Sequence, residues 1–354
     1  MAFKKLVSVS VLSSLLTLSS SHPYQPHPRW ENLTDIPIVA RQEHTGVMLP
    51  PDNLVIFGGI IPNASAVPIP FTTVNMVQSY SIGSKSWRTL APLPRAMNHV
   101  NVAVVDGKVY AFGGLDDGGP EQMVLNAVGD SWVYDPAGDA WTPLPPVPDV
   151  PRGMAALGVH DGRIFLAGGF TALGMRGQGP HASVSDVSVF DTKTGKWLPD
   201  LIPANARHLP APRDHAGYVV VDGKLYVVGG FDNGTPGRSN TVFILDLTDL
   251  GKGWKTSAAQ MPTARGGFAW GLLGSKLYTF GGEGNPEVQS GTFNETEVYD
   301  LATDSWAKLE PMPVPRHSVP GFAFDGKVYI PGGGLLGGRL RQATLTSTIL
   351  KQYV

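Results

Sequence analysis

Three histidines stand at matching places in the chain, in a pattern that suits proton-transfer chemistry. Counting 14 residues back from each of six Gly-Gly pairs gives, in order, His44, His99, Met154, His215, Gly267 and Ser318. His317 stands one residue out of that register. The imidazole pKa lies near neutrality, which suits a general acid or base. We therefore take His44, His99, His215 and His317 as candidate catalytic residues, the alternative being that each is structural.

An arginine precedes each of these positions, and apolar residues occupy the segments around them. The arginines are Arg41, Arg95, Arg152, Arg213, Arg265 and Arg316. A pocket that combines apolar walls with a few convergent polar groups is the usual small-molecule site. The candidate substrate-binding residues are Arg41, Arg95, Met154, Arg213, Phe268, Trp270, Phe170 and Phe231. A histidine cluster can also hold a metal ion, but positions on alternate repeats would lie far apart, so we predict no metal site.

A repeat of 51 to 61 residues predicts the elements that position these groups. The glycine pairs end stretches such as "VVDGKVYAFGG", "VHDGRIFLAGG" and "VVDGKLYVVGG". Each stretch reads as a strand, a two-residue turn and a second strand. Segments such as "SWVYDP" and "EVYDL" supply a third strand, and a tryptophan opens a fourth. Four short antiparallel strands repeated around a ring predict an all-β, six-bladed β-propeller.

The order of these motifs resembles the kelch family: Arg, an inner strand, Asp-Gly, Tyr, Gly-Gly, Tyr-Asp and Trp. The resemblance covers nearly the whole chain after residue 21, and it implies that the Arg-His pairs join neighbouring blades. Trp30 stands 11 residues before Arg41, as Trp141 stands 11 before Arg152. The N-terminal segment is therefore expected to complete the last blade and so remove a free sheet edge. We predict one propeller domain over residues 22–354.

The composition excludes several classes of function. The chain of 354 residues has a net charge of -2 and no cysteine. It therefore has no basic footprint for nucleic acid, no disulfide and no thiolate metal site. No HExxH or GxSxG motif occurs, and the glycine-rich segments are not followed by a helix, as a phosphate-binding loop would require. We predict no cofactor and no nucleic-acid or membrane partner.

The N-terminus and four sequons indicate export. "MAFKKLVSVSVLSSLLTLSSSH" has two lysines, an apolar run and small residues, which is the layout of a secretory signal peptide. We expect residues 1–21 to be cleaved and the mature protein to be secreted. The glycosylation sequons lie at Asn32, Asn63, Asn233 and Asn294.

Three functions fit this sequence. The chain resembles the secreted kelch-like hetero-Diels–Alderases of fungal tropolonic sesquiterpenoid pathways in length, signal peptide and apolar loops. That resemblance implies a His or Arg that promotes water loss from a hydroxymethyl tropolone, and a pocket that holds the resulting quinone methide against a terpene alkene. The alternative is a kelch module that binds a protein or a glycan without catalysis. A sugar mutarotase is a third possibility. It is disfavoured because the expected mouth has few carboxylates, of which Glu283 is one.

Overall fold

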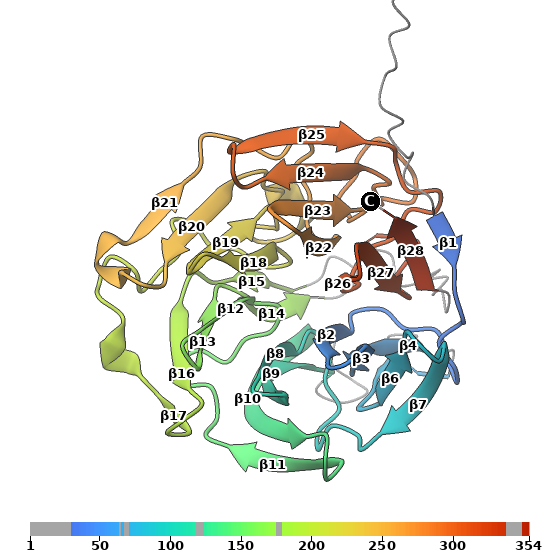
Figure 1. Cartoon of the computed structure of the whole chain (residues 1–354), viewed down its shortest axis with the longest axis horizontal. Helices are drawn as coiled ribbons and strands as arrows, with labels where there is room; N and C mark the ends of the chain where they lie inside the picture. The colour runs from blue at the N-terminus through green and yellow to red at the C-terminus, as the bar shows by residue number, and fades with distance from the viewer. Residues whose placement is uncertain are drawn as a thin grey trace, which may run out of the picture.

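The strands of this protein form six sheets around a common centre (Figure 1). The computed structural model describes residues 30–63, 65–66, 71–117, 124–174, 179–337 and 349–353. The predicted signal peptide lies outside the described residues. Within them the chain is built of strands and three single-turn helices, η2 (Pro199–Leu201), η3 (Thr235–Gly237) and η4 (Leu250–Lys252). The predicted six-bladed propeller is confirmed.

Each blade has four antiparallel strands, which follow one another in order from the centre of the ring to its rim. The innermost strands are β2 (Thr45–Leu49), β8 (Asn101–Val105), β12 (Ala156–His160), β18 (Gly217–Val221), β22 (Ala269–Leu273) and β26 (Phe322–Phe324). The second strands are β3 (Asn53–Phe57), β9 (Lys108–Asp116), β13 (Arg163–Ala167), β19 (Lys224–Val228), β23 (Lys276–Phe280) and β27 (Lys327–Pro331). The third strands are β6 (Val77–Ser81), β10 (Val124–Asp135), β16 (Val187–Asp191), β20 (Val242–Asp246), β24 (Thr296–Asp300) and β28 (Ile349–Tyr353). The outermost strands are β7 (Ser86–Leu90), β11 (Ala140–Leu144), β17 (Lys196–Trp197), β21 (Trp254–Thr256), β25 (Ser305–Leu309) and β1 (Trp30–Asn32).

The sixth blade joins the two ends of the described chain. Its sheet has the order β1-β28-β27-β26, with Trp30 paired to Gln352. Because the first strand covers the last, this sheet has no free edge at the junction.

Two further hairpins rise from the face opposite the tight inner turns. They are β4 (Ile60–Pro62) with β5 (Phe71–Thr73), and β14 (Phe170–Gly174) with β15 (His181–Ser183). Strand β14 also pairs with the extended end of β10, so it links the third blade to the second. In Figure 1 the β14–β15 hairpin projects toward the centre of the ring. We call the face that carries these hairpins the loop face.

Tryptophans and glycines fix the spacing between blades. The Trp141 indole donates to the Ala91 carbonyl of the preceding blade at 3.0 Å, and Trp197 donates in the same way to Pro145 at 3.0 Å. A Cβ on Gly168 would lie 2.3 Å from the Arg213 carbonyl oxygen of the next blade, and Gly168 also has a φ of +69°. Only glycine fits such a position. The repeated Trp and Gly-Gly motifs are therefore the parts that pack blade against blade.

No helix in the described part of the chain is long and apolar enough to cross a membrane.

Candidate functional site

Six residues, one before each inner strand, form a ring at the loop-face end of the central channel. Each has a left-handed backbone, with φ between 51° and 64°. Five backbone N–H groups donate to the carbonyl of the neighbouring member over 2.7–3.0 Å. The members are Glu43, His99, Met154, His215, Gly267 and Ser318. We call this set the inner ring; its hydrogen bonds hold the attached side chains in fixed positions.

The prediction that His44 belongs to this ring is wrong, because Glu43 occupies that position. The count of 14 residues fails in the first blade, where three residues (50–52) connect β2 to β3 instead of two. The His44 side chain is 2% exposed, and its Nε2–H donates to the Pro331 carbonyl at 2.9 Å. Burial, with the charge of Arg41, lowers the pKa of His44 to about 3, so this imidazole is neutral at physiological pH.

Five of the six predicted arginines are buried. Arg41 donates to the Met76 carbonyl at 3.0 Å, and Arg265 donates to the Gly281 carbonyl at 2.7 Å. Burial lowers the pKa of Arg41 to about 9. Both contacts lie within the blade that the arginine begins, so these side chains do not join blades as the kelch resemblance implied. The cross-blade bonds go to the arginines' backbone carbonyls: the Gly333 N–H of the sixth blade donates to the Arg41 carbonyl at 3.0 Å. Arg41 and Arg213 are packed within the protein rather than open to solvent.

Arg95 lies elsewhere, and its inclusion in the arginine set is wrong. Its side chain is 42% exposed and pairs with Asp116 and Asp130 on the surface. The fully buried Met97 stands in its place: the Gly59 N–H bonds to the Met97 carbonyl, as the Gly230 N–H bonds to that of Arg265. The sequence "RAMNH" puts two more residues between Arg and His than "RDH" does.

Two of the predicted histidines do converge, and they meet on a carboxylate that the sequence did not single out. Glu43 Oε2 lies 2.8 Å from His99 Nε2 and 4.0 Å from His215 Nε2. The two imidazole centroids are 5.1 Å apart. The expectation that alternate blades hold these groups far apart is therefore wrong, because the inner ring is narrow.

The other ring nitrogens of these histidines are also engaged. His215 Nδ1 bonds to Asp214, and His99 Nδ1 bonds to Asn98 Oδ1. Asp214 also receives a bond of 3.0 Å from His181 Nε2. His181 was not predicted, since it follows no repeat; it comes from β15 and joins the cluster only because that hairpin folds over the ring.

The electrostatics of this cluster favour charge separation. Burial raises the pKa of Glu43, but the neighbouring His99, His215 and His317 outweigh it and bring that pKa to about 2. Burial lowers the pKa of His215, but the bond and charge of Asp214 and the charge of Glu43 raise it to about 9. Asp214 likewise has a lowered pKa, because bonds from His181 and His215 outweigh its burial. The shifts favour charged Glu43 and Asp214 carboxylates beside a protonated His215.

His317 lies at the edge of the same region. Its Nε2–H donates to the Leu336 carbonyl at 3.0 Å, and its Nδ1 lies 2.8 Å from Ser318 Oγ and 3.5 Å from Glu283. It is 2% exposed. Like His99 and His215, it is enclosed within the protein.

An apolar lid encloses the inner ring on the loop face. Phe170 is fully buried and stacks on His181 and His215 at 5.2 Å from each, and Phe231 packs on His215 at 5.6 Å. Phe170 also belongs to a buried apolar cluster with residues of the other loop-face hairpins, namely Ile60, Phe71, Leu115 and Leu125. The apolar loop residues therefore pack on one another and shield the histidines.

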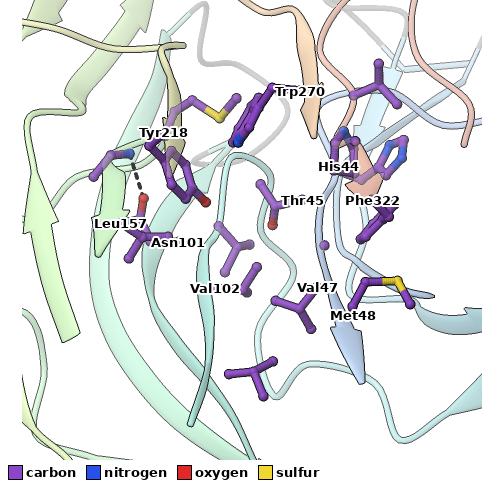
Figure 2. Close-up of a pocket in the computed structure, with 18 of the residues that line it drawn as sticks. His44, Thr45, Val47, Met48, Asn101, Val102, Leu157, Tyr218, Trp270 and Phe322 are labelled. Carbon is purple, nitrogen blue, oxygen red and sulfur yellow. Dashed lines mark hydrogen bonds between the residues drawn. The ribbon is translucent and has the colours of Figure 1, made fainter. Parts of the chain in front are cut away.

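The cavity lies on the other side of the inner ring, in the channel between the innermost strands (Figure 2). It has a volume of about 290 Å³, near the lower end of the roughly 300–1,000 Å³ typical of small-molecule sites. Its walls are mostly apolar. Of the four candidate histidines only His44 lines it, together with the predicted Met154 and Trp270. The predicted Phe268 packs behind Trp270, at 6.3 Å between centroids.

One register of the inner strands supplies much of the wall. The residues three places after each ring member are Gly46, Val102, Leu157, Tyr218, Trp270 and Gly321, and all of them line the cavity. The two glycines belong to the neighbouring first and sixth blades. The two aromatic rings come from the fourth and fifth blades, where Tyr218 packs against Trp270 at 4.8 Å (Figure 2). Sequence reasoning found Trp270 but missed Tyr218, although the same register in the fourth blade gives it.

The polar groups of the cavity differ in how far they are satisfied. Asn101 is saturated: it donates to the Phe112 and Arg152 carbonyls and accepts from the Ala155 N–H. The Thr45 hydroxyl is buried and has no hydrogen-bond partner among the described residues. Burial raises the pKa of Tyr218, so its hydroxyl stays protonated and can donate. His44 Nδ1 is likewise buried without a partner among the described residues. The groups available to a bound molecule are therefore the Thr45 and Tyr218 hydroxyls and His44 Nδ1.

Comparison with known proteins places the chain in a family. The chain matches the family described as "KLHDC2/KLHL20/DRC7 Kelch-repeats domain" over residues 27–199 and 174–333. It belongs to the kelch-repeat family of β-propellers. It is 38% identical to "Kelch-like protein terF" of Aspergillus terreus over 98% of this chain and 73% of that protein.

More distant matches agree on the fold. The chain is 28% identical to human "Kelch domain-containing protein 3" over 68% of this chain and 64% of that protein, just under two thirds of its length. The solved structure titled "Structure of YjhT" aligns with a TM-score of 0.68 at 17% identity, over 90% of this chain and 95% of the other. That likeness concerns the fold alone.

Proposed function

We propose that this protein is a secreted enzyme of secondary metabolism that takes a small, largely apolar molecule into its central channel and needs no organic cofactor. The observation that carries the proposal is the apolar cavity of about 290 Å³ with a few polar groups on its wall, among them the Tyr218 hydroxyl and the unsatisfied Thr45 hydroxyl and His44 Nδ1. An apolar pocket with a few placed polar groups is the usual form of such a site. The proposal is supported by the 38% identity between this chain and a fungal kelch-like protein.

The reaction that we propose is a hetero-Diels–Alder cyclisation of the kind that the sequence resemblance implies. A hydroxymethyl tropolone loses water: the C–O bond of the hydroxymethyl group breaks, and the tropolone hydroxyl gives up its proton. The resulting quinone methide then adds across a terpene alkene, forming one C–C and one C–O bond. No redox step occurs, so no electron carrier is needed.

The channel residues have defined parts in this scheme. Tyr218 donates a hydrogen bond to an oxygen of the tropolone, which assists departure of water and polarises the quinone methide. Trp270 offers an aromatic face for the tropolone ring. The apolar walls hold the alkene against it and exclude water, so that the two reactants meet in one orientation. The acid role falls to Tyr218 because His99 and His215 are buried outside the cavity.

Turnover by a chain with a blocked channel tests the proposal. Purified protein is incubated with a hydroxymethyl tropolone and a terpene alkene, and the rate and enantiomeric excess of the cycloadduct are measured. Val102→Trp fills the channel and is expected to abolish catalysis, whereas Val314→Trp, at a position 37% exposed, is expected to leave it unchanged. Leu157→Phe serves as a second channel variant should Val102→Trp fail to fold.

The outcome separates this proposal from a binding module. A binding module predicts that the wild-type chain gives no more adduct than buffer does, whatever the channel contains. If wild type and Val102→Trp give equal rates and equal enantiomeric excess, the channel is not the site of reaction.

A further inference from the structure

Two imidazoles and a carboxylate from three different blades converge at the centre of the inner ring. His99 comes from the second blade, His215 from the fourth and Glu43 from the first. The donor atoms His99 Nε2, His215 Nε2 and Glu43 Oε2 all lie within 4.8 Å of one another. Two histidines and one carboxylate are a common ligand set for zinc and other divalent transition metals.

The atoms that face the centre lack good hydrogen bonds. His99 Nε2 and Glu43 Oε2 are 2.8 Å apart, yet both are buried without a hydrogen bond of acceptable geometry. The His99 side chain is 1% exposed, so solvent does not satisfy it. Buried polar atoms without a partner are costly, and a cation between the three donors would satisfy them together.

Outer contacts already orient both imidazoles as metal ligands require. Asn98 accepts from His99 Nδ1, and its own amide is fixed because its Nδ2 donates to Thr73 Oγ1 at 2.7 Å. Asp214 accepts from His215 Nδ1. A ligating histidine almost always donates its other ring N–H to a carboxylate or carbonyl oxygen, which directs the Nε2 lone pair at the metal. Both histidines here have that arrangement.

The distances fit a metal after a small shift of the donor side chains. Zinc bonds of 2.0–2.1 Å in a tetrahedron put neighbouring ligand atoms about 3.3 Å apart. Glu43 Oε2 lies 2.8 Å from one nitrogen and 4.0 Å from the other, and these values bracket that length. The third separation, between the two Nε2 atoms, is at most 4.8 Å, so the three donors would have to close in slightly around a bound ion.

We propose that Glu43, His99 and His215 bind one divalent transition-metal ion, with Zn²⁺ the best match, which joins the first, second and fourth blades across the propeller axis. The surroundings suit a cation, since Asp214 adds negative charge behind His215. Phe170 packs against both imidazoles at 5.1–5.2 Å and encloses the site. The site lies apart from the channel wall, so its existence does not depend on the cyclase proposal.

The test uses the full chain without a purification tag. The protein is stripped with a chelator, titrated with ZnCl₂, and then measured for bound zinc and for Tm. We expect one zinc per chain and a Tm about 5 °C higher when free zinc is 100-fold above Kd. Cobalt in place of zinc should give the visible absorption of a low-coordinate site.

Variants locate the ion. Glu43→Gln keeps the side-chain shape and is expected to abolish stoichiometric binding, and Asp214→Asn is expected to weaken it 10- to 100-fold, roughly the effect of losing an outer-shell partner. The control is His208→Gln, since His208 is 59% exposed and lies 3.9 Å from Asp186 on the surface. If wild type binds no zinc, or if Glu43→Gln binds as much as wild type, the proposal is overturned and the cluster is an ion-pair network only. Should Glu43→Gln not fold, the Asp214→Asn affinity decides in the same way.

Discussion

Replacement of Tyr218 by phenylalanine should separate activity from stability. The Tyr218 hydroxyl lies at the cavity wall, and no hydrogen bond joins it to the rest of the described chain. Removing a hydroxyl that the folded protein leaves unsatisfied costs no internal hydrogen bond. Its ring contact with Trp270, at 4.8 Å, is kept by phenylalanine. We therefore expect the free energy of unfolding to stay within about 0.5 kcal/mol of wild type, or to rise.

In Tyr218→Phe, kcat/KM should fall by a factor set by the free energy of one lost hydrogen bond to the reacting molecule. A bond between neutral groups contributes about 0.5–1.5 kcal/mol, and one to a charged group about 1.5–3 kcal/mol. The substrate oxygen gains negative charge as the quinone methide polarises, so the upper range applies, and kcat/KM should drop about 10- to 150-fold.

The assay measures kcat/KM for adduct formation and the urea unfolding midpoint of the same preparations. Tyr278→Phe is the matched control, because Tyr278 is buried between blades and does not line the cavity. Wild-type kcat/KM and enantiomeric excess in Tyr218→Phe would refute the role that we give to this hydroxyl. A large loss of stability would refute the claim that it has no structural partner.

Three further predictions concern the scaffold and the surface. Arg265→Met should lower the free energy of unfolding by about 3–5 kcal/mol, since it leaves Glu297 buried and unpaired; an unchanged urea midpoint would contradict this. His99→Ala should lower Tm by several degrees and leave the binding of tropolone in the channel intact, because His99 pairs with Glu43 outside the cavity. Loss of tropolone binding at an unchanged Tm would instead give His99 a role in the site. Expression in a fungal host should add N-linked glycans, whose removal by an amidase is measured as a fall in mass. An unmodified mass would count against export. The acceptor residues are Asn32, Asn63, Asn233 and Asn294.

The repeat made the fold predictable, because every blade carries the glycine pair and a tryptophan, and five of the six carry the two-residue turn. Six-fold recurrence of a local pattern specifies a ring even when each copy is a weak signal. Errors arose where the pattern was counted rather than read from the backbone. One additional residue between β2 and β3 moved the predicted ring member from Glu43 to His44, and two additional residues after Arg95 hid its replacement by Met97.

The site was predicted only in part, because the direction of each side chain determines which residues meet, and the sequence pattern does not give that direction. His99 and His215 were correctly expected to lie at the channel end, but the lid above them is built from hairpins that follow no repeat. Apolar loop residues pack together and bury the histidines instead of lining a mouth. The open space falls where glycines and small residues leave room between inner strands, which a residue count around the ring does not reveal.

The measurement closest to the central claim is a crystal structure of the protein soaked with tropolone. The account predicts that the tropolone ring lies in the channel beside Trp270, with one oxygen within hydrogen-bond distance of Tyr218 Oη. Tropolone bound on the loop face, or a channel left empty at saturating tropolone, would contradict it.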